Sequence, residues 1–189
     1  ADALREATPE TQKTAIRAAF KQALDAWQPQ LEADRLRKTL QLLVHDADAL
    51  IDVHCDAVAC AHAFANKHQA ATAEALAQCL DLDVLLLEDD LHIMAFDEAF
   101  AAPWWRLGEK LQVPLADTPF ATTLELRGER DIDDATAARD AANLLRFLKY
   151  LGAVAGDAHL HERAPLATPL AGVARITAPQ AGLLHFHVR

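Results

Sequence analysis

Hydrophobic residues recur with helical spacing in five stretches of the chain. In the first, Thr8 precedes Pro9, a pair that is typical of a helix N-terminus, and apolar positions then follow a 3.6-residue period as far as Pro29. The same pattern predicts further helices over residues 31–45, 70–80, 96–111 and 133–151. In the helix of residues 31–45, four positions are predicted to face the core: Leu36, Leu40, Leu43 and Val44. Pro103 is expected to begin or kink the helix of residues 96–111.

Short apolar runs, which are typical of buried strands, lie between these helices. One ends at His54, and the others cover residues 83–87 and 121–128. Strands that alternate with helices favour a sheet with helices on both of its faces. The sequence therefore predicts an α/β domain of three layers, built on a mixed, largely parallel sheet.

The pattern changes near Gly152, where glycine and proline interrupt every helical period. Two β-like runs follow, over residues 172–178 and 182–188. We therefore expect an α/β domain over residues 1–164 and the beginning of a small C-terminal β domain over residues 165–189. Because the chain begins without Met and stops inside a strand-like run, we also expect it to be part of a longer protein.

Composition narrows the class of partner. The 189 residues are 52% hydrophobic and 24% charged, with a formal net charge of −10, which argues against nucleic acid or an anionic membrane as a partner. No apolar run approaches the roughly 20 residues of a membrane helix. The cysteines Cys55, Cys60 and Cys79 are odd in number and form no Cys-x-x-Cys pair, so we expect buried, unpaired thiols and a cytoplasmic location.

Candidate chemistry centres on Asp52 and His54, at the end of the first predicted strand. Residues two apart on a strand point to the same face, so both side chains project together. Imidazole is a common zinc ligand, and a neighbouring carboxylate fixes its orientation. Glu125 lies in the run of residues 121–128 and is a second candidate. Taken alone, a histidine at a strand end is more often a hydrogen-bonded structural residue than a metal ligand, and Glu125 has the alternative of an ion pair with Arg127.

Four segments, in this order, resemble the succinylglutamate desuccinylase/aspartoacylase family, whose members are relatives of the zinc carboxypeptidases. They are ADALIDVHCDA at 47–57, FDEAFAAPWWRL at 96–107, ATTLELRGERDIDDA at 121–135 and TAPQAGLLHFHV at 177–188. The resemblance implies a zinc carboxypeptidase-like fold. It also implies hydrolysis of the amide bond of an N-acyl amino acid or a related small amide.

The resemblance assigns roles to three residues. His54 falls on the third zinc ligand of the family. Asp52 is the neighbouring carboxylate that would orient the His54 ring without binding the metal itself. Glu125 matches the general base, which activates the water at zinc and passes its proton to the leaving amine. No substrate-binding residue is assigned, and the resemblance permits a homo-oligomer.

This sequence departs from the family pattern at the metal. The first two zinc ligands of the family come from a His-x-x-Glu motif before the Asp-x-His strand, and none precedes His54; the Asn-Arg element that grips the substrate carboxylate is absent as well. His159 and Glu162 have the His-x-x-Glu spacing but lie late, in the Gly/Pro-broken segment. Either the missing ligands lie outside this chain, or the site is lost. Three hypotheses stay open: a zinc-dependent deacylase, a zinc carboxypeptidase that acts on peptides, and a scaffold or binding relative without a complete metal centre.

Overall fold

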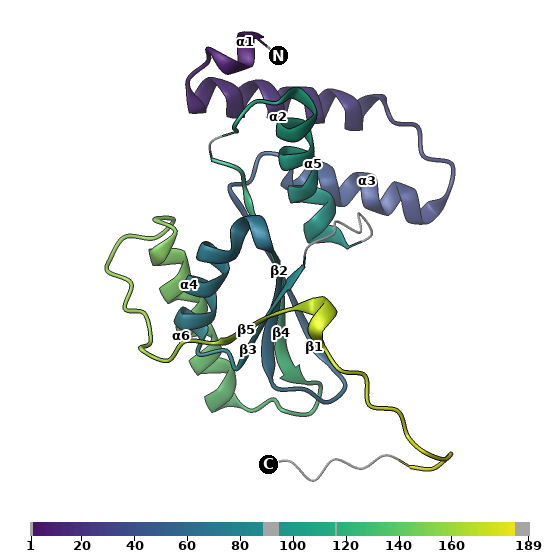
Figure 1. The fold of residues 1–189 in the computed structure, drawn as a ribbon, viewed down its shortest axis with the longest axis vertical. Coiled ribbons are helices and arrows are strands. Elements are labelled where there is room, and N and C mark those ends of the chain that lie inside the picture. Colours follow the sequence, from purple (N-terminus) through teal and green to yellow (C-terminus); the bar gives the residue numbers. More distant parts are fainter. Residues whose placement is uncertain (1, 89–94, 116, 184–189) are drawn as a thin grey trace.

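The computed structural model describes residues 2–88, 95–115 and 117–183 (Figure 1). Its helices are α1 (Asp2–Arg5), α2 (Pro9–Ala26), α3 (Glu32–Val44), α4 (Ala70–Leu80), α5 (Phe96–Leu111) and α6 (Asp134–Tyr150). Its strands are β1 (Ala49–Asp56), β2 (Ala61–Asn66), β3 (Val84–Glu88), β4 (Phe120–Gly128) and β5 (Leu166–Pro169). Short 3-10 turns, η1 (Lys67–Gln69) and η2 (Leu170–Gly172), follow β2 and β5.

The five strands form one sheet in the order β1-β4-β2-β3-β5. Three of the four strand pairs are parallel, and only β2 and β4 run antiparallel. This mixed, largely parallel sheet confirms the predicted α/β class. Because β2 opposes β4, the carboxyl ends of β1 and β4 lie at one end of the sheet, and those of β2 and β3 lie at the other.

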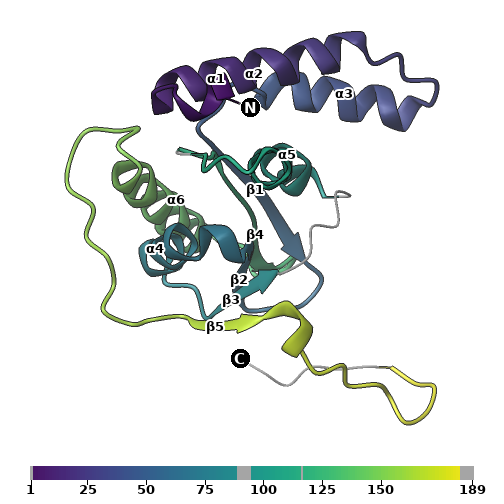
Figure 2. The same cartoon turned by 45° about the horizontal axis from the view of Figure 1, so that its top comes forward.

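Helices cover both faces of the sheet (Figure 2). Helices α4 and α6 lie on one face, over the main apolar core, which includes Leu76, Leu85, Leu124 and Phe147. Helix α5 covers the other face, where Phe100 and Trp105 pack against Ala121 of β4. The α2–α3 pair lies over α5, with Phe20 against Trp104 at 5.8 Å between ring centroids. The predicted three layers are therefore present, and the α2–α3 pair adds a further one.

Capping residues near the helix ends agree with the helix boundaries of the structure. Thr8 caps α2 by accepting a hydrogen bond from the Thr11 amide at 3.3 Å, and Asp133 caps α6 through the Thr136 amide at 2.8 Å. Helix α5 begins at Phe96, so Pro103 lies inside it rather than at its start. Among the described residues, no helix is both long and apolar enough to cross a membrane.

The structure differs from the predicted apolar pattern in helix α3 and in strand β2. The predicted inner face of α3 holds at two of its four positions: Val44 packs against the apolar cluster of α5, and Leu40 is partly buried. The other two positions are exposed, Leu36 to 60% and Leu43 to 71%. Helix α3 contacts α5 and α2, and no described segment covers the side that carries Leu36 and Leu43. Strand β2 was missed altogether, because its sequence AHAFAN is rich in alanine and lacks the β-branched residues that mark strands.

The segment after residue 164 differs in part from the expectation. Residues Leu166–Pro169 form β5, which pairs with β3 at the edge of the main sheet. The predicted β run at 172–178 was wrong, because these residues form only η2 and irregular chain. Most of the run at 182–188 lies outside the described residues. The boundary of a second domain at residue 165 stays a prediction.

Candidate active site

The predicted site residues meet on the face of the sheet that α5 covers. His54 of β1 lies directly opposite Glu125 of β4, and Asp52 lies opposite Thr123 one step earlier. Paired residues of neighbouring strands share a face, so these four side chains project from the same side. Leu50, on the same face of β1, packs against the apolar cluster of α5, which identifies that side.

His54 and Asp52 form a close pair. His54 Nε2 lies 3.1 Å from Asp52 Oδ1. The hydrogen bond with Asp52 raises the pKa of His54, and the negative charges of Asp52, Glu125 and Asp97 add to this effect, while burial opposes it. The His54 side chain is 49% exposed, so its ring is open to a ligand. A carboxylate on one ring nitrogen is the arrangement that commonly orients a metal-binding imidazole.

Glu125 has unsatisfied hydrogen-bonding capacity. Its Oε2 is buried, and no partner for it exists among the described residues. A buried carboxylate oxygen without a donor is costly unless water, a ligand or another protein segment satisfies it. The arrangement therefore leaves Glu125 free to accept a proton or a hydrogen bond from a bound molecule.

Arg127 does not pair with Glu125, so that alternative was wrong. The register of β1 and β4 shifts between His54 and Asp56, and Arg127 adopts a left-handed backbone with φ of 73° inside this irregularity. The side chain turns to the opposite face, where it forms two hydrogen bonds with Asp140 of α6, at 2.7 and 2.9 Å. Its charge is thereby directed away from Glu125.

His62 is a residue of the site that the sequence patterns do not single out. It is buried on β2, directly opposite Glu125, and its Nδ1 contacts the Cys60 carbonyl oxygen at 2.9 Å. Its ring packs edge-on against Phe64 at 5.2 Å. His62 therefore forms a side wall of the site. Its position was hidden from sequence reasoning because β2 itself was missed.

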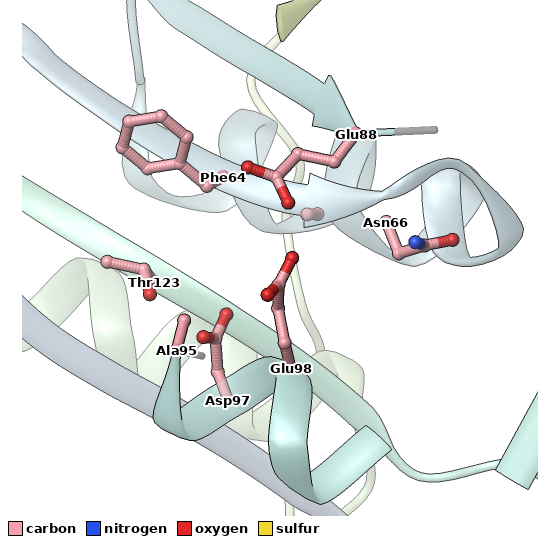
Figure 3. A pocket seen from close by; sticks show the side chains of 8 residues that line it. Phe64, Asn66, Glu88, Ala95, Asp97, Glu98 and Thr123 are labelled. Carbon is pink, nitrogen blue, oxygen red and sulfur yellow. The ribbon is translucent and has the colours of Figure 1, made fainter. Parts of the chain in front are cut away.

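Asp97 is a further residue that the sequence patterns did not single out. It lies in the first turn of α5, is only 5% exposed, and points toward Thr123 (Figure 3). Burial raises its pKa, while hydrogen bonds from the Glu98 amide and the Thr123 side chain lower it. Acidic residues are common in the first turn of a helix, where they interact favourably with the helix dipole. The sequence alone therefore does not distinguish Asp97 from an ordinary residue of this kind.

Other candidate metal ligands stay apart. Within the described residues, no group of three His, Cys, Asp or Glu side chains is arranged to hold a metal ion. His159 and Glu162 are exposed in irregular chain, and the neighbouring His161 contacts Arg146 at 2.7 Å instead.

The cysteines do not supply the missing ligands. Cys55 and Cys60, expected to be buried, are exposed, and of the three cysteines only Cys79 is buried. The described residues thus bring together one imidazole and its carboxylate partner, not a full set of zinc ligands.

The fold and these side chains define a mixed α/β protein whose polar site lies between a sheet and one helix. A scan against protein-family models gives no match. A search of curated proteins gives none either.

Solved structures give clear matches. A protein from Shewanella amazonensis, described as a member of the succinylglutamate desuccinylase/aspartoacylase family, is 26% identical with a TM-score of 0.81, over 95% of this chain and 50% of its own. A protein from Shewanella frigidimarina, described as a succinylglutamate desuccinylase/aspartoacylase, is 24% identical with a TM-score of 0.82, over 97% of this chain and 50% of its own. The family resemblance indicated by the sequence motifs is therefore confirmed by the fold, and the chain spans about half the length of these proteins.

Proposed function

We propose that this chain carries part of the active site of a zinc-dependent hydrolase, which cleaves the amide bond of an N-acyl amino acid or a related small amide. The observation that carries the proposal is the arrangement on β1 and β4. There, a carboxylate-oriented imidazole lies opposite a glutamate with a free, buried oxygen. The likeness to structures of the desuccinylase/aspartoacylase family supports hydrolysis as the reaction class.

The residues fit part of a zinc site. With Asp52 on Nε2, His54 would bind the metal through Nδ1, and Asp52 would hold the ring in place. Catalytic zinc takes three protein ligands, so the proposal requires two more from outside the described residues. Bound zinc would supply a water of lowered pKa and would polarise the amide carbonyl.

Glu125 has the role of general base. Its free oxygen takes the proton of the attacking water as oxygen bonds to the carbonyl carbon, and the same carboxyl group then returns the proton to the leaving nitrogen. The carbon–nitrogen bond breaks, and the products are a carboxylic acid and an amine. Arg127 is held on the other face by Asp140, so it does not neutralise the base.

The zinc content of the intact protein that contains this chain tests the proposal. We expect about one zinc per chain, as in catalytic sites of this type, and its loss in His54→Ala. His159→Ala is the matched control, because it removes a histidine of the late His-x-x-Glu spacing and should leave zinc unchanged.

Two other results would change the proposal. If both His54→Ala and the native protein lack zinc, the hydrolase is wrong, and the alternative of a scaffold or binding relative is supported. If zinc is present but only peptides are cleaved at their C-terminus, the carboxypeptidase alternative replaces the deacylase. The cytoplasmic location and a homo-oligomer remain predictions from the sequence.

A further inference from the structure

A pocket of about 190 Å³ lies beside the candidate active site, between the sheet and the start of α5 (Figure 3). Its polar lining comes from the ends of β2 and β3, from β4 and from the first turn of α5. The polar residues that line it are Asn66, Glu88, Asp97, Glu98 and Thr123, and the remaining lining is Phe64, Ala65 and Ala95. Three carboxyl groups therefore share one small space.

Two buried polar atoms in this lining have no partner among the described residues. Asp97 is 5% exposed, and its Oδ1 accepts no hydrogen bond there. Figure 3 draws its carboxyl group pointing into the space between Thr123 and Glu98. Asn66 is 8% exposed, and its Nδ2 is likewise without an acceptor, while its Oδ1 accepts from the His68 amide. Buried groups of this kind usually find a partner in water or in a bound molecule.

The charge of the pocket is unbalanced. None of the eight described residues that line it is Lys, Arg or His. Burial raises the pKa of Glu98 to about 8, and its hydrogen bond with Glu88 and the negative charges of Glu88 and Asp97 add to the effect. Figure 3 shows the carboxyl groups of Glu88 and Glu98 facing each other across the pocket. The raised pKa means that Glu98 holds a proton beside the charges of Glu88 and Asp97. A bound cation in place of that proton would also offset these negative charges.

The geometry favours an organic cation over a metal ion. Within the described part of the chain, these carboxyl groups are not among any set of three that could coordinate a metal. An ammonium group has directional N–H donors and needs no tight coordination shell, so it suits separated acceptors such as Asp97 and Glu88. The free Nδ2 of Asn66 would donate a hydrogen bond to an oxygen atom of the same bound molecule.

The strand register connects this pocket to the candidate active site. Glu125 lies opposite His62, Thr123 lies opposite Phe64, and Asn66 is two residues further along β2. Each two-residue step along a strand is about 7 Å, so the pocket begins about 7 Å from Glu125 and extends away from it. A substrate whose amide lies at Glu125 would reach the pocket with a short alkyl chain.

We propose that this pocket binds a primary ammonium group of the substrate, so that the preferred substrates are amides that carry a cationic amine a few carbons from the scissile bond. The inference rests on the proposed hydrolase function, and it adds the substrate class. Glu88, Asp97 and Glu98 are its specificity residues. The carboxyl oxygens accept the ammonium N–H donors, and the bound cation replaces the proton of Glu98.

Direct binding to the intact protein tests the pocket without relying on catalysis. The probes are three amides of similar size: N-acetyl-1,4-diaminobutane, which is cationic, N-acetylbutylamine, which is neutral, and N-acetyl-4-aminobutyrate, which is anionic. We expect calorimetric titration to give a dissociation constant about tenfold lower for the cationic amide than for the neutral one. This preference should fall to about twofold or less in Glu98→Gln and in Glu88→Gln.

Glu74→Gln is the matched control, because Glu74 is an exposed carboxylate on α4, away from the pocket lining. It should keep the preference. Equal binding of the three probes to the unaltered protein overturns the proposal, as does a preference that survives both pocket substitutions.

Hydrolysis of the same three amides separates this proposal from the proposed function. Cleavage of all three at similar rates, with no preference in binding, would refute the ammonium pocket and leave the hydrolase intact. A cationic preference in binding without cleavage of any amide would support the pocket and count against the hydrolase. Fastest cleavage of the cationic amide, with that advantage lost in Glu98→Gln, would support both.

Discussion

The two faces of the sheet are built from the same strands but have opposite characters. On β4, Leu124 points into the apolar core under α4 and α6, whereas Thr123 and Glu125 point toward α5. The first face is filled by side chains such as Phe147, which is fully buried. The second contains carboxyl groups, histidines and a pocket. Because side chains alternate along a strand, one face stabilises the fold while its neighbour is free to carry chemistry.

Arg127 shows how sharply the two faces are separated. Strict alternation would have directed it to the side of Glu125, but the irregularity in β4 turns it to the opposite face. There, it neutralises Asp140, which is buried on α6. The cationic side chain nearest to Glu125 along the strand thus serves stability on one face, and the other face keeps its negative charge.

The largest expected effect comes from Glu125→Gln on the polar face. The glutamine keeps the shape of the side chain but cannot accept the proton, so amide hydrolysis should fall by about 10²- to 10⁴-fold. The free energy of unfolding should change by less than about 1 kcal/mol. Initial rates and denaturant unfolding of the intact protein measure both quantities. Hydrolysis at an unchanged rate would remove Glu125 from the mechanism, and the exposed Glu74→Gln controls for the loss of a carboxylate.

Phe147→Ala on the apolar face should have the reverse pattern. Phe147 is fully buried against Phe120, with ring centroids 5.6 Å apart, so its truncation should lower the free energy of unfolding by about 3–5 kcal/mol. The hydrolysis rate per folded molecule should stay unchanged. Leu145→Ala is the control on the same helix, because Leu145 is exposed and should cost about 0.5 kcal/mol or less. Equal losses in the two variants would mean that the apolar face is not the stabilising one.

The smallest effect concerns the pH dependence of stability. The pKa of Glu98 is about 8 in the folded protein against an ordinary value of 4.5, so between these pH values the unfolded chain releases a proton that the native state retains. Native stability due to Glu98 is therefore complete below pH 4.5, declines as the pH rises, and levels off above about pH 8.

Glu98→Gln removes this titration. The variant should gain about 1–2 kcal/mol relative to the unaltered protein as the pH rises through this range, a value reduced by the partial exposure of Glu98. Denaturant unfolding at a series of pH values measures it. A constant difference between the two proteins would show that Glu98 titrates normally in the native state.

Much of the site was predictable because it depends on local spacing. Asp52 and His54 are two residues apart, so any strand brings them to one face, and the structure has them 3.1 Å apart. The caps at Thr8 and Asp133 are equally local, because each side chain accepts from an amide three residues further on. That Glu125 and His54 would belong to one site was implied only by the family resemblance, and their direct opposition is seen only in the structure, because strand spacing carries no information about register between strands.

The remaining features of the site depend on contacts between segments that are distant in the sequence. The antiparallel insertion of β2 between β4 and β3 buries His62 opposite Glu125 and brings Asn66 to Glu88. The docking of α5 on the sheet then carries Asp97 and Glu98 into the same space, although each reads in sequence as an ordinary acidic residue at a helix start. Local sequence patterns were therefore enough to predict five of the six described α-helices, three of the strands and the Asp52–His54 pair, because hydrophobic periodicity and capping act over a few residues. The order of the strands, the open face of α3 and the acidic pocket depended on long-range packing, which no local pattern encodes.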